Sequence, residues 1–219
     1  MNPSWALQDR FLARFFTGPL AETFYLTGGP ALARFYFQHR ESEDLDLFTN
    51  DQDQDFTLVL QTVTAILHAL DLQTVSQAAT DTFIRYIVRD PAGTLLKVDL
   101  VKDVPVRFGD PITHQTGVRI DSLQNIGANK VLAVFGRTDA KDFIDLYWIL
   151  QNTALTFDAL FAKACEKDAG LSELYLAYAL QNCAKIRLFP RMLKPLAWDE
   201  IQTYFVTLAR VLITRIKPG

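Results

Sequence analysis

Hydrophobic and polar residues follow two different patterns along the chain, and the change between them falls near residue 120. In the front part, apolar residues at three- and four-residue spacing predict amphipathic helices over 5–16 and 56–70. Short runs of apolar and β-branched residues predict strands over 24–26, 45–48, 82–88 and 94–101. The front part therefore combines helices with a small sheet, whose last two strands are joined by the turn Asp90-Pro91-Ala92-Gly93.

The rear part of the chain shows only the helical pattern. Its apolar spacing predicts five helices, over 123–135, 140–150, 157–167, 172–185 and 198–216. We therefore predict an α+β fold with two domains, an α/β domain over 1–120 and a helical domain over 121–219.

The composition excludes several classes of protein. Of the 219 residues, 49% are hydrophobic and 21% are charged, and this balance builds a sizeable core and excludes disorder. No run of about 18 uncharged apolar residues occurs, so we expect no membrane span. Asp9, Arg10 and Arg14 interrupt the first apolar pattern, which argues against a signal peptide. The two cysteines, Cys165 and Cys183, cannot form a disulfide framework, and we expect a cytoplasmic protein.

Charged residues are distributed unevenly between the two parts. Residues 1–120 carry 10 Lys and Arg against 15 Asp and Glu, whereas residues 121–219 carry 12 against 10. An acidic front part argues against a protein that coats nucleic acid, and it suits a protein that gathers carboxylates around a cation.

The most informative pattern is a diglycine followed by an aspartate pair. Gly28-Gly29 lies between a predicted strand and a short predicted helix over 31–37, and Pro30 occupies a position that helix starts tolerate. Two glycines let the backbone approach a ligand closely, and the amides of a helix start favour an anion such as a phosphate. Asp44 and Asp46 lie two residues apart on the next predicted strand, so they share one face.

Two neighbouring carboxylates repel each other, and a divalent cation relieves that repulsion; oxygen ligands suit Mg²⁺ or Mn²⁺. A lone diglycine is most often a turn and a lone Asp-x-Asp a solvated strand end, but the combination is far more specific. Asp99 lies in an apolar predicted strand, where an unpaired charge is costly. It is either the partner of a nearby Arg or Lys or the third carboxylate of the cluster. For a close cluster, we expect Asp44→Asn to raise the melting temperature of the metal-free protein.

Two segments of the chain resemble a known family. They are 26–48, with Gly28-Gly29 and Asp44-Leu45-Asp46, and 129–147, with Asn129-Lys130 and Lys141-Asp142. Both resemble the nucleotidyltransferase AbiEii/AbiGii toxins, within the DNA polymerase β-like nucleotidyltransferase superfamily. The resemblance implies a small mixed nucleotidyltransferase-type sheet flanked by helices, followed by an all-helical C-terminal part.

The resemblance also implies an activity, namely transfer of a nucleoside monophosphate from a nucleoside triphosphate such as ATP or GTP to an acceptor hydroxyl. The implied cofactor is Mg²⁺ or Mn²⁺, and its ligands, which are also the catalytic carboxylates, would be Asp44, Asp46 and Asp99. This chemistry requires positioning and charge neutralisation more than covalent catalysis.

Further residues receive roles from the same resemblance. Gly28 and Gly29 would hold the triphosphate, and Lys130 would contact the phosphates. Asp142 matches the rear acidic position of the family, and the resemblance counts it with Lys130 among the catalytic residues. Arg40 is a secondary candidate for a phosphate contact. Pro30 departs from the family pattern, because it lacks an amide hydrogen and removes one phosphate contact.

The implied partners are a nucleoside triphosphate and a DNA-binding antitoxin protein of a bacterial toxin–antitoxin or abortive-infection pair. The acceptor is left open between tRNA or another RNA, a protein hydroxyl and a small molecule. The alternative is a catalytically weak relative that binds a nucleotide or a partner protein as a regulator. A basic segment in the rear part has two interpretations, an exposed helix end or a contact for an RNA backbone. It contains Lys185, Arg187, Arg191 and Lys194.

Overall fold

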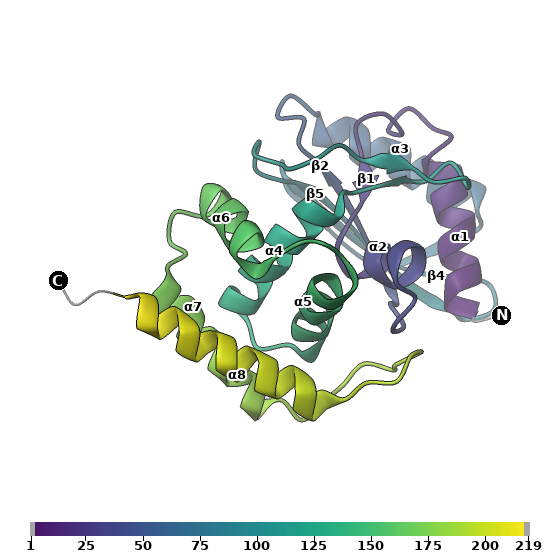
Figure 1. The fold of residues 1–219 in the computed structure, drawn as a ribbon. Coiled ribbons are helices and arrows are strands. Elements are labelled where there is room, and N and C mark those ends of the chain that lie inside the picture. The colour runs from purple at the N-terminus through teal and green to yellow at the C-terminus, as the bar shows by residue number, and fades with distance from the viewer. Residues whose placement is uncertain (1–2, 217–219) are drawn as a thin grey trace. The chain divides into compact units, whose positions relative to one another are not determined.

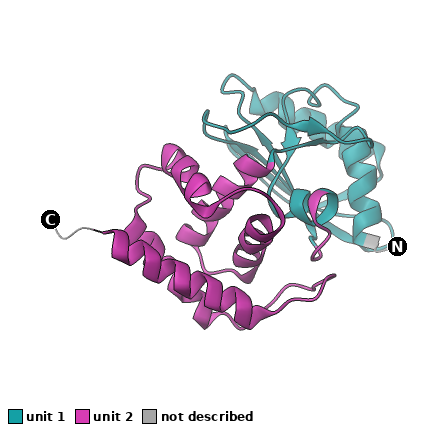
Figure 2. Ribbon diagram, viewed as in Figure 1, with its two compact units in different colours: residues 1–35, 42–122 teal, residues 36–41, 123–219 magenta. Residues whose placement is uncertain are grey.

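The computed structural model describes residues 3–216, and the chain divides into two compact units (Figure 2). Unit 1 comprises Met1–Phe35 and Ser42–Ser122, and unit 2 comprises Tyr36–Glu41 and Leu123–Gly219. The short segment Tyr36–Glu41 therefore belongs with the helices of the rear part, although its neighbours in sequence belong to unit 1. The sequence pattern contains no indication of this crossing.

Unit 1 is built on a mixed sheet, which Figure 1 shows together with the helices of this unit. Its seven strands lie in the order β3-β4-β5-β2-β1-β7-β6. Its strands are β1 (Tyr25–Leu26), β2 (Asp44–Thr49), β3 (Gln73–Ala79), β4 (Phe83–Arg89), β5 (Leu95–Lys102), β6 (Ile112–Thr113) and β7 (Arg119–Ile120). The central strands β2 and β5 are parallel, whereas β4 is antiparallel to β5 and β1 is antiparallel to β2. The predicted α+β class with a mixed sheet is confirmed.

Two helices of unit 1 bury the apolar side of this sheet. They are α1 (Pro3–Phe15) and α3 (Phe56–Ala69), and Asp55 caps α3 by accepting a hydrogen bond from the amide of Thr57. Phe15 of α1 packs edge-to-face on Phe24, whose ring lies 6.3 Å from that of Phe56. This aromatic contact joins both helices to the sheet.

Alternation along β2 decides which residues enter that core. Leu45 and Leu47 are completely buried, while Asp44 and Asp46 are only partly buried on the other face. The same alternation on β5 places Val98 and Leu100 in the core. The apolar half of each strand thus holds the acidic half in place.

Three strands have no counterpart in the predicted pattern. All seven residues of β3 are exposed, and its sequence Gln-Thr-Val-Ser-Gln-Ala-Ala lacks the alternation that marks a half-buried strand. β6 and β7 have two residues each, which is too short for a periodic signal. Their pairing partners in the sheet, rather than their own sequence, make these segments strands.

Unit 2 is helical, as predicted for the C-terminal part. Its elements are α4 (Leu123–Gly136), α5 (Ala140–Asn152), α6 (Phe157–Lys167), α7 (Glu173–Gln181), the 3₁₀ turn η2 (Asn182–Lys185) and α8 (Trp198–Arg215). Asp139, Thr156 and Ser172 cap α5, α6 and α7 through their side-chain oxygens. A methyl group on Gly127 of α4 would lie 2.7 Å from Leu160, so this glycine permits the close packing of α4 on α6.

Within residues 3–216, no helix combines the length and the apolar character that a membrane crossing requires.

Candidate active site

The diglycine forms the first turn of a short helix rather than a loop before it. α2 (Gly28–Ala31) begins at Gly28 and continues as the π-helical turn η1 (Leu32–Tyr36). Gly28 has φ +63°, a left-handed conformation that favours glycine. A methyl group at this position would also lie 3.0 Å from Oδ2 of Asp46. Gly28 is therefore required twice, by the backbone conformation and by the close approach of the Asp46 carboxylate.

A buried carboxylate that the sequence pattern did not reveal supports this turn. The Thr27 hydroxyl donates a hydrogen bond of 2.7 Å to Oδ2 of Asp121, which is fully buried. The Thr27 amide donates to the carbonyl of Asp46, so the start of α2 is tied to β2 as well. Arg107 lies 3.1 Å from the other Asp121 oxygen and stacks over the ring of Tyr25. Asp121 is 94 residues from Thr27 in the chain, which explains why no local signal marks it.

The predicted carboxylates come together on one face of the sheet. The register of β2 and β5 places Asp46 directly beside Asp99 and Asp44 directly beside Lys97. The Asp44 side chain is 39% exposed and that of Asp99 is 10% exposed. Asp44, Asp46, Asp99 and the glycine turn therefore form a connected site within unit 1, which we call the acidic face.

Two cationic side chains already engage the acidic face. Arg85 of β4 makes two hydrogen bonds of 2.7 Å to the two oxygens of Asp99, and its pKa is raised mainly by this contact. Lys97 of β5 lies 2.6 Å from Oδ2 of Asp44 and 3.8 Å from Oδ2 of Asp99. These cations therefore offset part of the repulsion between Asp44 and its neighbouring carboxylates. Because less repulsion is left to relieve, Asp44→Asn is expected to stabilise the protein less than the sequence alone predicts.

The acidic face suits a divalent cation by the chemistry of its donors, since it offers carboxylate oxygens from adjacent strands. Its side-chain conformations do not form a complete ligand set, because Asp44 and Asp99 are paired with Lys97 and Arg85. Accordingly, no three His, Cys, Asp or Glu side chains in the described range 3–216 are arranged to hold a metal ion. Cation binding would require these ion pairs to rearrange.

A second charged cluster lies inside unit 2, where it holds the segment Tyr36–Glu41 on α5. Arg40 donates to both oxygens of Asp145, from Nε and from Nη2, at 2.7 Å each. His39 Nε2 lies 2.8 Å from Oδ1 of the same carboxylate. Lys130 of α4 contacts Oδ2 of Asp145 at 2.7 Å and Oδ1 of Asp142 at 2.8 Å. We call these residues the buried cluster, since both carboxylates are fully buried.

The pKa values of the buried cluster reflect strong mutual compensation. Burial acts to raise the pKa of Asp145, but the charges of Arg40 and Lys130 hold it well below its usual range. Burial acts to lower the pKa of Lys130, but Asp145 and Asp142 raise it overall. Burial does lower the pKa of His39, so this imidazole is neutral near pH 7. The cluster therefore consists of two carboxylates, a neutral imidazole and their charged Arg and Lys partners.

The backbone of the crossing segment is paired as well. The amides of Leu193 and Lys194 donate to the carbonyl of His39, and the amide of Glu41 donates to the carbonyl of Arg191. The Trp148 ring packs 5.2 Å from the His39 ring. Segment 36–41 is thus held by unit 2 through both its side chains and its backbone.

The predicted site residues therefore fall into two groups. Gly28, Gly29, Asp44, Asp46 and Asp99 lie in unit 1, and Arg40, Lys130 and Asp142 lie in unit 2. Members of the second group contact one another through the buried cluster. Lys97 is the partner that the sequence pattern could have revealed, because it lies two residues before Asp99 and so on the same face. Arg85 and Asp145 could be assigned only after the strands and helices were placed.

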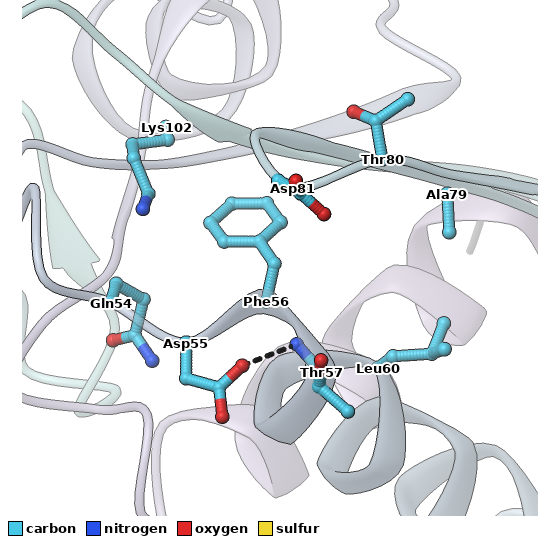
Figure 3. A pocket seen from close by; sticks show the side chains of 9 residues that line it. All are labelled: Gln54, Asp55, Phe56, Thr57, Leu60, Ala79, Thr80, Asp81 and Lys102. Carbon is cyan, nitrogen blue, oxygen red and sulfur yellow. Dashed lines mark hydrogen bonds between the residues drawn. The ribbon is translucent and has the colours of Figure 1, made fainter.

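A surface pocket of about 330 Å³ lies where α3 begins (Figure 3). Its lining residues are Gln54, Asp55, Phe56, Thr57, Leu60, Ala79, Thr80, Asp81 and Lys102. Asp55 is engaged as the helix cap, and Lys102 donates to the carbonyl of Gln52. Alternation along β5 places Lys102 on the opposite side of the strand from Asp99. This pocket is therefore separate from the acidic face and contains no predicted site residue.

The basic segment of unit 2 is exposed along most of its length. Lys185, Arg187, Arg191 and Lys194 are all exposed, and so are the apolar side chains of Leu188 and Phe189 between them. Arg191 forms an ion pair with Glu41, while Lys194 lies over the Trp148 ring. The segment thus combines positive charge with accessible apolar and aromatic surface.

Comparison with solved structures shows the class of fold. A candidate nucleotidyltransferase from H. pylori is 19% identical with a TM-score of 0.63, covering 97% of this chain and 94% of that one. JHP933 from Helicobacter pylori is 18% identical with a TM-score of 0.61, covering 98% and 94%. MenT4, a nucleotidyltransferase toxin from Mycobacterium tuberculosis, is 13% identical with a TM-score of 0.56, covering 94% and 82%. The chain therefore has a nucleotidyltransferase-type fold.

The family follows from the sequence itself. The model of the nucleotidyl transferase AbiEii toxin family, of type IV toxin–antitoxin systems, matches residues 10–204. The chain belongs to this family, which confirms the resemblance seen in its two motif segments. No curated protein sequence matches the chain.

Proposed function

We propose that this protein is a metal-dependent nucleotidyltransferase that transfers a nucleoside monophosphate from a nucleoside triphosphate to an acceptor hydroxyl. The observation that carries this proposal is the acidic face, where the Asp46 carboxylate lies so near the glycine turn that a methyl group on Gly28 would be 3.0 Å from it, and where Asp46 neighbours Asp99 on the next strand. Membership of a nucleotidyl transferase toxin family supports the same reaction class.

In this proposal, Asp44, Asp46 and Asp99 hold Mg²⁺ or Mn²⁺. When bound there, the metal would neutralise charge on the triphosphate and lower the pKa of the reacting hydroxyl. Gly28 and Gly29 let the backbone approach the phosphates, and Thr27 with Asp121 keeps that turn in position. Pro30 offers no amide hydrogen, so the phosphate contacts come from the residues around it.

Arg40, Lys130 and Asp142 act in this proposal mainly by holding segment 36–41, which joins the glycine turn to the strand of the aspartates. Their contacts with one another and with Asp145 support this role. A direct contact of Lys130 or Arg40 with phosphates stays a prediction of the family resemblance.

For the acceptor we propose an RNA, such as tRNA, bound with the help of the basic segment. Four exposed cations would contact phosphates, and Phe189 offers an aromatic surface to an unpaired base. The proposed biological setting is a bacterial toxin–antitoxin pair with an antitoxin protein as partner, and the family assignment supports it. The proposed compartment is the cytoplasm.

The experiment is an incubation of the protein with each labelled nucleoside triphosphate, Mg²⁺ and total RNA. We expect label transfer to RNA, and we expect Asp46→Ala and Asp44→Ala to abolish it. Asp110→Ala is the matched control, since it removes another exposed carboxylate of unit 1. Nucleotide binding without transfer to any acceptor would contradict the enzyme and favour a nucleotide-binding regulator of the same fold.

A further inference from the structure

We propose that Arg85 and Lys97 are built-in counter-ions of the acidic face, which hold its carboxylates in place without metal and are displaced when a divalent cation binds. This inference rests on the proposed function, because it assumes that the acidic face binds a cation. Arg85 is on this view a positioning residue, which acts on Asp99 rather than on the substrate.

Arg85 binds Asp99 in a specific, bidentate geometry. Arg85 and Asp99 are directly opposite each other in the register of β4 and β5. Both guanidinium nitrogens that face Asp99 make hydrogen bonds of 2.7 Å, so the carboxylate is bound at both oxygens. The guanidinium carbon of Arg85 also lies over the ring of Phe83, 5.2 Å from the ring centroid. The lone pairs of Asp99 that face Arg85 are therefore engaged, and the guanidinium charge opposes a cation beside the same carboxylate.

Lys97 completes the charge balance on the same face. Its amine is 2.6 Å from Asp44 and 3.8 Å from Asp99, and so lies between two carboxylates. With Arg85 it sets two positive charges against the three aspartates of the face. This nearly balanced arrangement explains how three carboxylates can share adjacent strands in a metal-free protein.

The two counter-ions are also placed so that they can leave. The Arg85 side chain is 45% exposed and that of Lys97 is 30% exposed, so both have solvent to move into. In the buried cluster, by contrast, the Arg40 side chain is only 2% exposed and has no such room. An exposed ion pair exchanges partners at low cost, whereas a buried pair does not.

If a divalent cation displaces Arg85 from Asp99, removing Arg85 should change the metal affinity by a predictable factor. A cation that must compete with Arg85 for Asp99 binds more weakly than one that finds Asp99 free. We expect Arg85→Gln to tighten Mn²⁺ binding about fivefold, the equivalent of about 1 kcal/mol for an ion pair whose cation is exposed and whose carboxylate is buried. Arg89→Gln is the matched control, because Arg89 is exposed on the same face of β4 but pairs in register with Leu95. We expect it to leave Mn²⁺ affinity unchanged within about twofold.

The experiment measures Mn²⁺ binding by calorimetry and the melting temperature of the metal-free protein, for wild type and the variants R85Q, R89Q, D46N and D99N. Without metal, R85Q should melt about 2–4 °C lower, since Asp99 loses its partner beside Asp46. Adding D99N to R85Q should recover part of that loss. R85K, which keeps the charge but not the paired hydrogen bonds, should fall between R85Q and wild type in both measurements.

The outcomes separate the two proposals. If wild type binds Mn²⁺ and D46N abolishes binding, the metal site stands; R85Q with unchanged or weaker affinity would then overturn the counter-ion role alone. If neither wild type nor R85Q binds Mn²⁺, the proposed metal site fails and the counter-ion role fails with it. If R85Q binds Mn²⁺ where wild type does not, or binds it more tightly, the counter-ion role is supported.

Discussion

The acidic face of unit 1 and the buried cluster of unit 2 pair the same kinds of residue in different surroundings. Each pairs Asp with Arg and Lys, at 2.6–2.8 Å in the closest contacts. On the acidic face, the Asp44 and Arg85 side chains are 39% and 45% exposed, whereas Asp142 and Asp145 in the cluster are 0% exposed. The contacts are alike, and solvent access makes the difference.

Solvent access decides whether an ion pair can be exchanged for a ligand. Water reaches Arg85, Lys97 and Asp44, so these charges stay solvated when a pair separates, and a cation can then take the place of the counter-ion beside the buried Asp99. Inside unit 2, a charge that loses its partner stays desolvated, and the cost is several times larger. The buried cluster therefore suits a structural role, and the acidic face suits a site that binds and releases charged ligands.

The largest effect that tests this comparison is expected from Asp145→Asn. This change leaves Arg40 and Lys130 without their shared carboxylate, and we expect a loss of about 3–5 kcal/mol of unfolding free energy. Urea unfolding at pH 7 measures it. Asp158→Asn is the control, because Asp158 forms an exposed ion pair with Arg215. The melting temperature of this variant should stay within about 2 °C of that of wild type.

The pH dependence of the stability difference between wild type and D145N gives an independent check. The pKa of Asp145 is depressed in the folded protein, so its contribution is complete above the ordinary carboxyl pKa of 3.8 and is lost as pH falls through the folded value. The difference in stability between wild type and D145N should therefore be constant from pH 7 to about 5 and shrink below about pH 4. A difference that instead shrinks between pH 7 and 5 would show that another group is responsible.

An intermediate effect is expected from Gly28→Ala at the edge of the acidic face. The left-handed backbone alone costs an alanine about 1–2 kcal/mol, and the contact with Asp46 adds to that cost. Gly117→Ala is the matched control, since Gly117 has φ +83° but nothing within 4 Å of the added methyl group. Thermal unfolding of the two variants isolates the Asp46 contact, and equal losses would show that the contact relaxes freely.

The smallest effect is expected from Asp44→Asn. Simple repulsion among the aspartates predicts a gain in metal-free melting temperature, but Lys97 already compensates Asp44 in the structure. We therefore expect a change of less than about 1 kcal/mol in unfolding free energy. Calorimetric melting in the presence of a chelator measures this change. A clear rise in melting temperature would mean that Lys97 does not offset the repulsion on the acidic face.

Much of the fold could be predicted from local pattern. Periods of two and of three to four residues separated strands from helices, and the diglycine with Asp44 and Asp46 pointed to the correct family. The exposed strand β3 was missed, because its seven residues have no buried face and so no alternation. The crossing of segment 36–41 into unit 2 was also missed, since it depends on contacts with residues about a hundred positions later.

The sequence by itself determined the order of the main helices and of four of the seven strands, the acidic pair on one side of β2 and the membership of the nucleotidyl transferase toxin family. These features are local, because they depend on side-chain period and on the spacing of a few residues. Only the tertiary structure decided which polar and charged groups are partners: Thr27 with Asp121, Arg85 with Asp99, and Arg40 with Asp145. Charge pairing depends on distance and burial in three dimensions, and residues 14–105 positions apart in the chain carry no local record of either.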